Sequence, residues 1–142
     1  MRKTIKESFI ILSCLLMLHS CATRKTSGGT NAGLEGKKWE LVSADGLTAG
    51  DPAPYVEFGS KAGELRGKGG CNGFGGNYSV KGDEIKIEGI IGTKMACDQL
   101  TIENAFFKAM ESSDRFKVAG NTLRLYQGKK LVATLNASAS QD

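Results

Sequence analysis

The residue types best suited to catalysis or metal binding are few in this chain. Its 142 residues include one histidine, His19, and four cysteines, Cys14, Cys21, Cys71 and Cys97. Histidine is the usual general base near neutral pH and a common metal ligand, and cysteine thiolates act as nucleophiles or zinc ligands. What these residues can do depends on which of them remain in the mature chain.

Residues 1–20 predict a secretory signal peptide. A basic start, MRKTIK, precedes an apolar run from Phe9 to Leu18. That run is too short to span a bilayer, which takes roughly 20 apolar residues. A basic start, a short apolar stretch and a small residue before the cleavage point are typical of signal peptides. A buried N-terminal helix is the alternative interpretation.

The end of this segment resembles the lipobox of bacterial lipoproteins. Leu18 stands three residues before Cys21 and Ser20 directly before it, while His19 departs from the small or β-branched residue usual in that family. The resemblance implies that Cys21 carries a diacylglyceryl group and becomes the acylated N-terminus, and two or three acyl chains anchor a protein stably. The alternative is a secreted protein whose Cys21 stays free.

Residues 21–33 predict a flexible tether between the anchor and the domain. After Cys21 the sequence ATRKTSGGTNAG is small and polar and has no apolar periodicity. Position 22 is alanine rather than aspartate, which by resemblance to lipoproteins of enteric bacteria favours the outer membrane over the inner one. We therefore expect a lipid-anchored protein of the cell envelope, at the periplasmic face of the outer membrane.

Removal of the signal peptide would also remove two of these five residues, His19 and Cys14, and the lipid would occupy a third, Cys21. The mature chain would contain no imidazole, which excludes His-dependent nucleophilic systems and His-containing zinc sites. Cys14 would leave as well, so Cys71 and Cys97 would remain as a pair outside the cytoplasm, where such pairs usually form disulfides. Two buried free thiols are the alternative. We predict no metal site and no cofactor.

Charge gives no indication of a nucleic-acid partner. Signal removal would leave 16 basic side chains against 14 acidic ones, too close to balance for a long-range positive field. An enzyme without histidine would need paired carboxylates, such as Asp83, Glu84 and Glu88, or a lysine base. These three carboxylates lie in or beside an expected hairpin, where charged groups are ordinarily solvated. We therefore predict a non-enzymatic protein.

The elements that must hold these residues are mostly β-strands. Short alternating apolar patterns and turn residues predict strands in the ranges 38–43, 56–58, 78–80, 85–87, 116–118, 123–125 and 131–135. Turns are expected at Lys81-Gly82-Asp83, Gly120-Asn121 and Gln127-Gly128. Strands at this spacing favour an antiparallel sheet that is curled or closed.

The segment between Asp98 and Ser113 has helical spacing instead. Its apolar residues recur three and four positions apart, with Asp98 as the expected N-cap, and they are Ile102, Ala105, Phe106, Ala109 and Met110. One amphipathic helix packed on the sheet makes an α+β domain. The face formed by Ile102, Phe106 and Met110 either fills the core or lines an apolar cleft that binds a ligand.

Residues 67–76 contain six glycines in ten positions. The phosphate-binding patterns GxxxxGK[ST] and GxGxxG do not fit them, and no helical pattern follows directly. The glycines instead predict positive φ angles, a bulge or a close backbone approach in a sharply bent strand.

The residues in and after this segment resemble two signatures of the META domain family, also called HslJ-like. The first signature, GCNxFxGxY, is matched by Gly70, Cys71, Asn72, Phe74, Gly76 and Tyr78. The second, TxMAC, is matched by Thr93, Met95, Ala96 and Cys97, and Glu103 fits the acidic position of the helix. The resemblance covers residues 34–136 and leaves 137–142 as a polar tail.

Membership in this family implies a small α+β fold with an antiparallel, partly open β-barrel or curled sheet packed against one amphipathic helix. That shape is similar to lipoprotein pilots of secretion systems, which hold an apolar cleft. Many members are envelope lipoproteins, some named for heat induction, and no catalytic activity is established. We expect structural roles for Asn72, Thr93 and the two cysteines.

The functional prediction is a non-enzymatic cell-envelope lipoprotein, a stress-related or accessory module that binds a protein or an apolar ligand. Its partners would be the membrane, through the lipid anchor, and an envelope protein or lipid. A structural or secretion-pilot-like lipoprotein and a carboxylate-based hydrolase are the alternatives.

Overall fold

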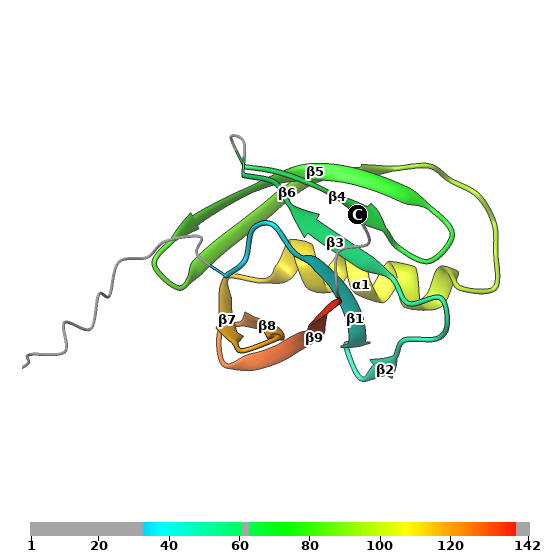
Figure 1. The fold of residues 1–142 in the computed structure, drawn as a ribbon. Helices are drawn as coiled ribbons and strands as arrows, with labels where there is room; N and C mark the ends of the chain where they lie inside the picture. Colours follow the sequence, from blue (N-terminus) through cyan, green and yellow to red (C-terminus); the bar gives the residue numbers. More distant parts are fainter. Residues whose placement is uncertain (1–32, 61–62, 139–142) are drawn as a thin grey trace, which may run out of the picture.

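The structure, a computed structural model, describes residues 33–60 and 63–138. The expected signal peptide, Cys21 and the tether up to residue 32 lie outside these residues. The described part of the chain forms nine strands and one helix (Figure 1). In chain order they are β1 Lys38–Ala44, β2 Leu47–Thr48, β3 Tyr55–Phe58, β4 Glu64–Lys68, β5 Gly73–Lys81, β6 Glu84–Gly92, α1 Leu100–Ser112, β7 Arg115–Ala119, β8 Thr122–Gln127 and β9 Lys130–Ser138.

The strands form one antiparallel sheet that curls into a partly closed ring. The sheet order is β2-β1-β3-β4-β5-β6-β7-β8-β9, and β1 also pairs with β9, so the first and last long strands meet. The ring is weakest between β6 and β7, which share a single residue pair, Glu84 with Arg115. This arrangement confirms the predicted α+β class with a curled, partly open sheet and one helix.

Helix α1 lies across the ring and completes its core. It runs between the part of the sheet formed by β3 to β6 and the part formed by β7 to β9 (Figure 1), and it contacts β1, β6, β8 and β9. Its buried residues include Phe106, Ala109 and Met110, as the apolar spacing predicts. Trp39 at the centre of the core is fully buried, and its indole N–H donates to Leu34 O at 2.7 Å. Within the described residues no helix is long and apolar enough to cross a membrane.

The elements differ from the sequence expectation in several places, and the short strand β2 lies outside all of the expected strand ranges. Gln99, not Asp98, is the N-cap residue of α1, and its side chain makes no capping hydrogen bond. Strand β4 was not expected, because Leu65 is its only buried residue and four polar or glycine residues surround it. Strand β9 includes Ala137 and Ser138, which pair with Trp39 and Lys38 of β1 although both were expected in the polar tail.

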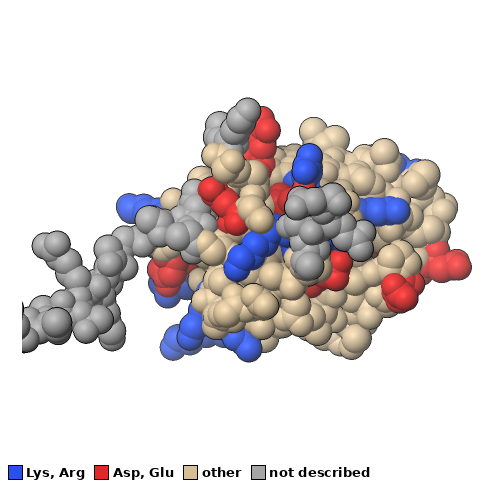
Figure 2. All heavy atoms as spheres, viewed as in Figure 1, with Lys and Arg blue, Asp and Glu red and all other residues tan. Residues whose placement is uncertain are grey.

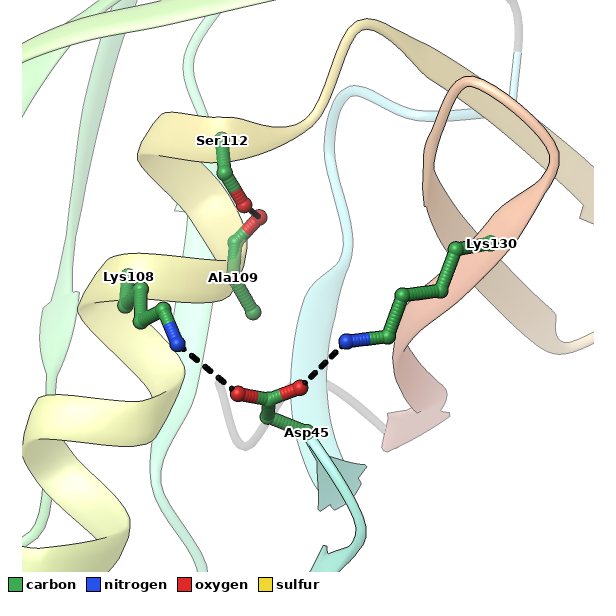
Figure 3. A network of polar contacts seen from close by, with 5 residues as sticks. All are labelled: Asp45, Lys108, Ala109, Ser112 and Lys130. Atoms are coloured by element: carbon green, nitrogen blue, oxygen red, sulfur yellow. Dashed lines mark hydrogen bonds and ion pairs between the residues drawn. The ribbon is translucent and has the colours of Figure 1, made fainter.

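One ion-paired network joins three distant segments at the β1–β2 turn. The Asp45 carboxylate accepts from Lys108 of α1 at 3.0 Å and from Lys130 of β9 at 2.8 Å (Figure 3). Hydrogen bonds from Lys130 and Lys108, together with their positive charges, lower the pKa of Asp45 to about 2. Asp45 also has a φ of 46°, a conformation that aspartate and asparagine adopt more readily than most residues.

We expect Asp45→Asn to remove part of the acid sensitivity of the fold. Because the folded pKa lies below the ordinary value of 3.8, the Asp45 contribution to stability is complete above that value and is lost as pH falls through about 2. Denaturant unfolding at pH values from 5 to 2 measures this dependence. Asparagine tolerates the same φ, so the variant isolates the charge. Identical pH dependences for the two proteins would contradict the role given to these ion pairs.

Candidate functional site: a clasp and a groove at the start of α1

A polar clasp, buried at Asn72 and Glu103, connects the two family signatures to the first turn of α1. The clasp consists of Asn72, Thr93, Met95 and Glu103. Asn72 Oδ1 accepts from Thr93 Oγ1 at 2.7 Å and from the Met95 N–H at 2.8 Å, and Asn72 Nδ2 donates to Met95 O at 3.2 Å. The same amide nitrogen donates to Glu103 Oε1 at 2.6 Å, and the Asn72 backbone N–H donates to Glu103 Oε2 at 2.9 Å.

The carboxylate of Glu103 is the least expected member of the clasp. It is only 3% exposed, and Asn72, at 1%, covers it. A buried carboxylate is costly unless each oxygen has a donor, and Asn72 supplies a donor to both. Glu103 also lies in the first turn of α1, where the helix dipole favours negative charge. The clasp therefore fixes the start of the helix to the loop between β4 and β5.

Glycines allow the β4–β5 loop to come close to α1. A Cβ added to Gly69 would lie 2.6 Å from Glu103 Cγ and 2.7 Å from Phe107 Cζ, so any side chain there would force the Glu103 and Phe107 side chains to move. Gly70 has a φ of 154°, and a Cβ on it would lie 3.0 Å from Gln99. The register of β5 also shifts between Gly75 and Asn77. Close approach, positive φ and a bulge are the three features that the glycine-rich segment predicts.

A disulfide joins the same two loops. Cys71, directly before Asn72, is bonded to Cys97, just before α1, with a Cα–Cα distance of 6.4 Å and a sequence separation of 26. The bond agrees with the predicted pairing of these cysteines. Together with the clasp it holds residues 69–72 against residues 93–97 by both covalent and hydrogen bonds.

We expect loss of the disulfide to lower the free energy of unfolding by about 3–4 kcal/mol, because a loop of this length restricts the unfolded chain. The measurement is urea unfolding of the wild type against the Cys71→Ser/Cys97→Ser double variant. A reductant should shift the wild-type midpoint to that of the variant and leave the variant unchanged. Wild-type midpoints that agree with and without reductant would contradict this expectation.

The other members of the first signature have structural contacts. Phe74 packs edge-on against Phe106 and Phe107, with ring centroids 6.1 and 4.9 Å apart. The Tyr78 hydroxyl lies 2.8 Å from both Glu35 Oε1 and Gly59 O. Burial, and then the hydrogen bond to Glu35, raise the pKa of Tyr78 above its ordinary value. A Cβ on Gly76 would lie 3.3 Å from Glu88 O, so this position is also closely packed.

The helix face proposed as an apolar cleft lies in the core. Phe106 and Met110 are fully buried, and Ile102 packs partly buried against the same core. This agrees with the first of the two interpretations, in which the face fills the interior. None of the three residues lines the cavity beside Met95 that is described next.

A groove of about 480 Å³ lies between the end of β6, the loop that follows it and the first turns of α1. Its walls combine the clasp with partly exposed apolar side chains and one lysine. The lining residues are Asn72, Ile90, Gly92, Thr93, Lys94, Met95, Ala96, Leu100, Glu103, Asn104 and Phe107. Beside it, Met95 is 55% exposed and Ile91 is 79% exposed. We call this cavity the groove.

The backbone of Met95 belongs to the clasp, whereas its side chain does not. Its N–H and C=O are both bound by Asn72, whereas the residue remains 55% exposed and lines the groove. The signature predicts the position of Met95 and gives no indication that its side chain is exposed. Sequence reasoning therefore missed the groove, which needs residues from β6, the following loop and α1 together.

The carboxylates considered for catalysis are ordinary surface groups. Asp83 pairs with Arg115 at 3.4 Å, and Glu88 pairs with Lys86 at 2.6 Å, while Glu84 is exposed. In the described part of the chain no group of three or more His, Cys, Asp or Glu residues could hold a metal ion. Basic and acidic side chains are interspersed over the face shown in Figure 2.

The sequence model of the META domain matches residues 32–139, which is most of the chain. This chain belongs to the META domain family. The family predicted from the two signatures is thereby confirmed, and the structure shows that several signature residues of this META domain build one polar clasp and one disulfide. No curated protein matches the chain.

Three solved structures share the fold of this META domain. A protein from Burkholderia xenovorans, solved by NMR, is 23% identical over 78% of this chain and 90% of its own, with a TM-score of 0.62. A second NMR structure is 24% identical over 80% of this chain and 98% of its own, with a TM-score of 0.61. A DUF4847 family protein from Bacteroides vulgatus ATCC 8482 is 16% identical over 80% and 100% of the two chains, with a TM-score of 0.57.

Proposed function

We propose that this META domain protein is a lipid-anchored protein of the cell envelope that binds an apolar group of a partner in the groove, without catalysis. The observation that carries the proposal is the half-exposed Met95 at a cavity whose lining includes several apolar side chains. Methionine is a flexible, polarisable side chain that suits binding surfaces. Its neighbours Ile90, Leu100 and Phe107 supply further apolar surface.

The rigidity of the walls supports binding. The loop that carries Met95 is held by Asn72 through two backbone hydrogen bonds and by the Cys71–Cys97 bond two residues later. A site whose backbone is already ordered loses less conformational entropy when a ligand binds. The clasp and the disulfide therefore serve the groove as well as the fold.

The position of the groove suits a partner that lies away from the anchor. The described chain begins at Gly33, which packs near Val118 of β7. The loop before α1, yellow-green in Figure 1, lies at the opposite end of the molecule. With a lipid on Cys21 and a tether to residue 33, the groove would lie at the end of the domain away from the tether.

The anchor is tested by replacing Cys21. We expect Cys21→Ala to abolish incorporation of labelled palmitate and to move the protein from the membrane fraction to the soluble fraction of the envelope. Cys14→Ala, in the apolar run before the cleavage point, is the matched control and should change neither result. Membrane association and lipid labelling of Cys21→Ala at the wild-type level would refute the proposed anchor.

The groove is tested with the full lipoprotein in cells. A photoreactive amino acid at Lys94 is expected to crosslink to a partner or a lipid, and Met95→Lys in the same protein is expected to reduce the product at least about tenfold. Leu131→Lys is the control, because Leu131 is 46% exposed on β9, away from the groove. Equal crosslinking by the two variants, or none from the wild type, would refute binding at this site.

A further inference from the structure

Strand β6 has one edge that is almost entirely without a strand partner. On one side it pairs with β5 along most of its length, whereas on the other side it pairs with β7 only at Glu84. Within residues 33–60 and 63–138 no other strand pairs with this second edge. An unpaired edge presents backbone N–H and C=O groups that another extended chain can bind.

The register shows which residues of β6 direct their backbone groups to this open edge. Ile85 donates its N–H to Asp114 O on the open side, and Thr93, just beyond the strand, donates to Gly73 O on the β5 side. Backbone groups alternate between the two edges of an antiparallel strand. Ile87 and Gly92 therefore present their backbone N–H and C=O groups to the open edge. Ile87 precedes the register shift near Gly89, and Gly92 follows it.

The end of β6 and the first turns of helix α1 both line the groove. Gly92 and Ile90 line it from β6, and Leu100, Asn104 and Phe107 line it from α1. An extended chain that adds to a free strand edge pairs with the backbone groups of that strand and can pack its side chains on a neighbouring helix. A lipid chain would fill the apolar part but would leave the backbone groups of Gly92 without a partner, which costs free energy.

Lys94 is the exposed charged residue at the rim of the groove, whereas Glu103 is buried. Its charged lining residues are Lys94 and Glu103. Both oxygens of Glu103 accept hydrogen bonds from Asn72, whereas Lys94 forms no ion pair with any residue of the described chain. A ligand therefore meets one positive charge at the rim.

We infer that the groove binds an extended peptide segment of a partner protein, which adds to the open edge of β6 as a further strand. The segment has an apolar side chain that packs beside Met95 and Phe107, and an acidic side chain next to Lys94. This inference rests on the proposed function and names the class of its partner.

The test uses the mature lipoprotein in lipid nanodiscs and two defined probes. The first is a library of acetylated and amidated nonapeptides with alternating apolar and polar positions and one acidic residue. The second is a photoactivatable phosphatidylethanolamine in the nanodisc. We expect a peptide from the library to bind and to slow hydrogen exchange at the amides of Ile87 and Gly92.

Methylation of the bound peptide separates strand addition from other modes of binding. Single N-methyl groups on alternate peptide amides are expected to weaken binding at least about tenfold, because those amides pair with β6. Methyl groups on the intervening amides, which point away from β6, are expected to change the affinity less than twofold. Equal effects at all positions would overturn the inference.

Variants and the lipid probe complete the test. Lys94→Glu is expected to weaken binding of the acidic peptide at least about fivefold. Lys117→Glu on β7 is expected to leave the peptide affinity unchanged. Labelling of the groove by the lipid probe, with no peptide bound, would overturn the inference and leave the proposed function standing. Binding of neither probe would overturn both. A dimer that Met95→Lys dissociates would show that a second copy of the chain occupies the groove, which also overturns the inference.

Discussion

The Asn72→Ala variant is expected to unfold with a free energy about 3–5 kcal/mol below that of the wild type, because it removes both side-chain donor and acceptor groups from the clasp. The Glu103 carboxylate would lose the 2.6 Å hydrogen bond from Asn72 Nδ2 while it stays buried at the start of α1. The Met95 backbone and the Thr93 hydroxyl would lose their partner as well. Of these groups, the Glu103 carboxylate is the most deeply buried, so the loss of its partner accounts for most of the expected effect.

Chemical denaturation followed by circular dichroism measures this effect. Asn104→Ala is the matched control, because Asn104 is an exposed asparagine on the same helix, and it should change the stability by less than about 0.5 kcal/mol. A loss for Asn72→Ala no larger than that of the control would show that the clasp is not the main support of this region.

A double-mutant cycle identifies the source of the loss. If the unpaired carboxylate accounts for most of it, Glu103→Leu should cost less in the Asn72→Ala background than in the wild type. Leucine removes the charge and places an apolar side chain of similar size beside Phe107. Equal costs of Glu103→Leu in the two backgrounds would mean that Asn72 and Glu103 contribute independently.

The Phe106→Ala variant is expected to lose about 3–5 kcal/mol of stability, because it opens a large cavity where α1 meets the sheet. Phe106 is fully buried and touches Phe74 edge-on. Its neighbour Phe107 is partly exposed and lines the groove. Phe107→Ala should therefore cost less stability than Phe106→Ala and should weaken binding in the groove more than Phe106→Ala does.

The measurement is a pair of unfolding curves together with binding of the selected peptide under conditions where both variants are folded. Greater destabilisation by Phe107→Ala than by Phe106→Ala would contradict the assignment of Phe106 to the core and of Phe107 to the groove. Equal losses of peptide affinity in the two variants would contradict the role of Phe107 in binding.

Local patterns predicted most of the fold. The alternation of Tyr78 and Val80, and of Ile85 and Ile87, across a glycine turn describes the β5–β6 hairpin, and the apolar spacing from Ile102 to Met110 describes α1. These patterns succeed because each element must bury one face. Strand β4 was missed because it buries little and is held by pairing with β3 and β5.

The sequence identified the residues of the clasp, but it did not predict the hydrogen bonds between them. The signatures identify Asn72, Thr93, Met95 and the acidic position of Glu103, and a structural role was expected for Asn72 and Thr93. That Asn72 supplies donors to both oxygens of Glu103, 31 residues away, depends on how close the β4–β5 loop comes to α1. No local propensity encodes that distance.

The amino-acid sequence alone therefore determined the family and the fold class and favoured the disulfide pair, because composition, periodicity and motif spacing are local properties of the chain. The tertiary structure decided where binding surface remains. It buried Phe106 and Met110, exposed the side chain of Met95, and left one edge of β6 open beside α1. These outcomes depend on the closure of the ring between β1 and β9 and its near-opening between β6 and β7. Such closure is set by packing among segments far apart in the chain, which no single stretch of sequence specifies.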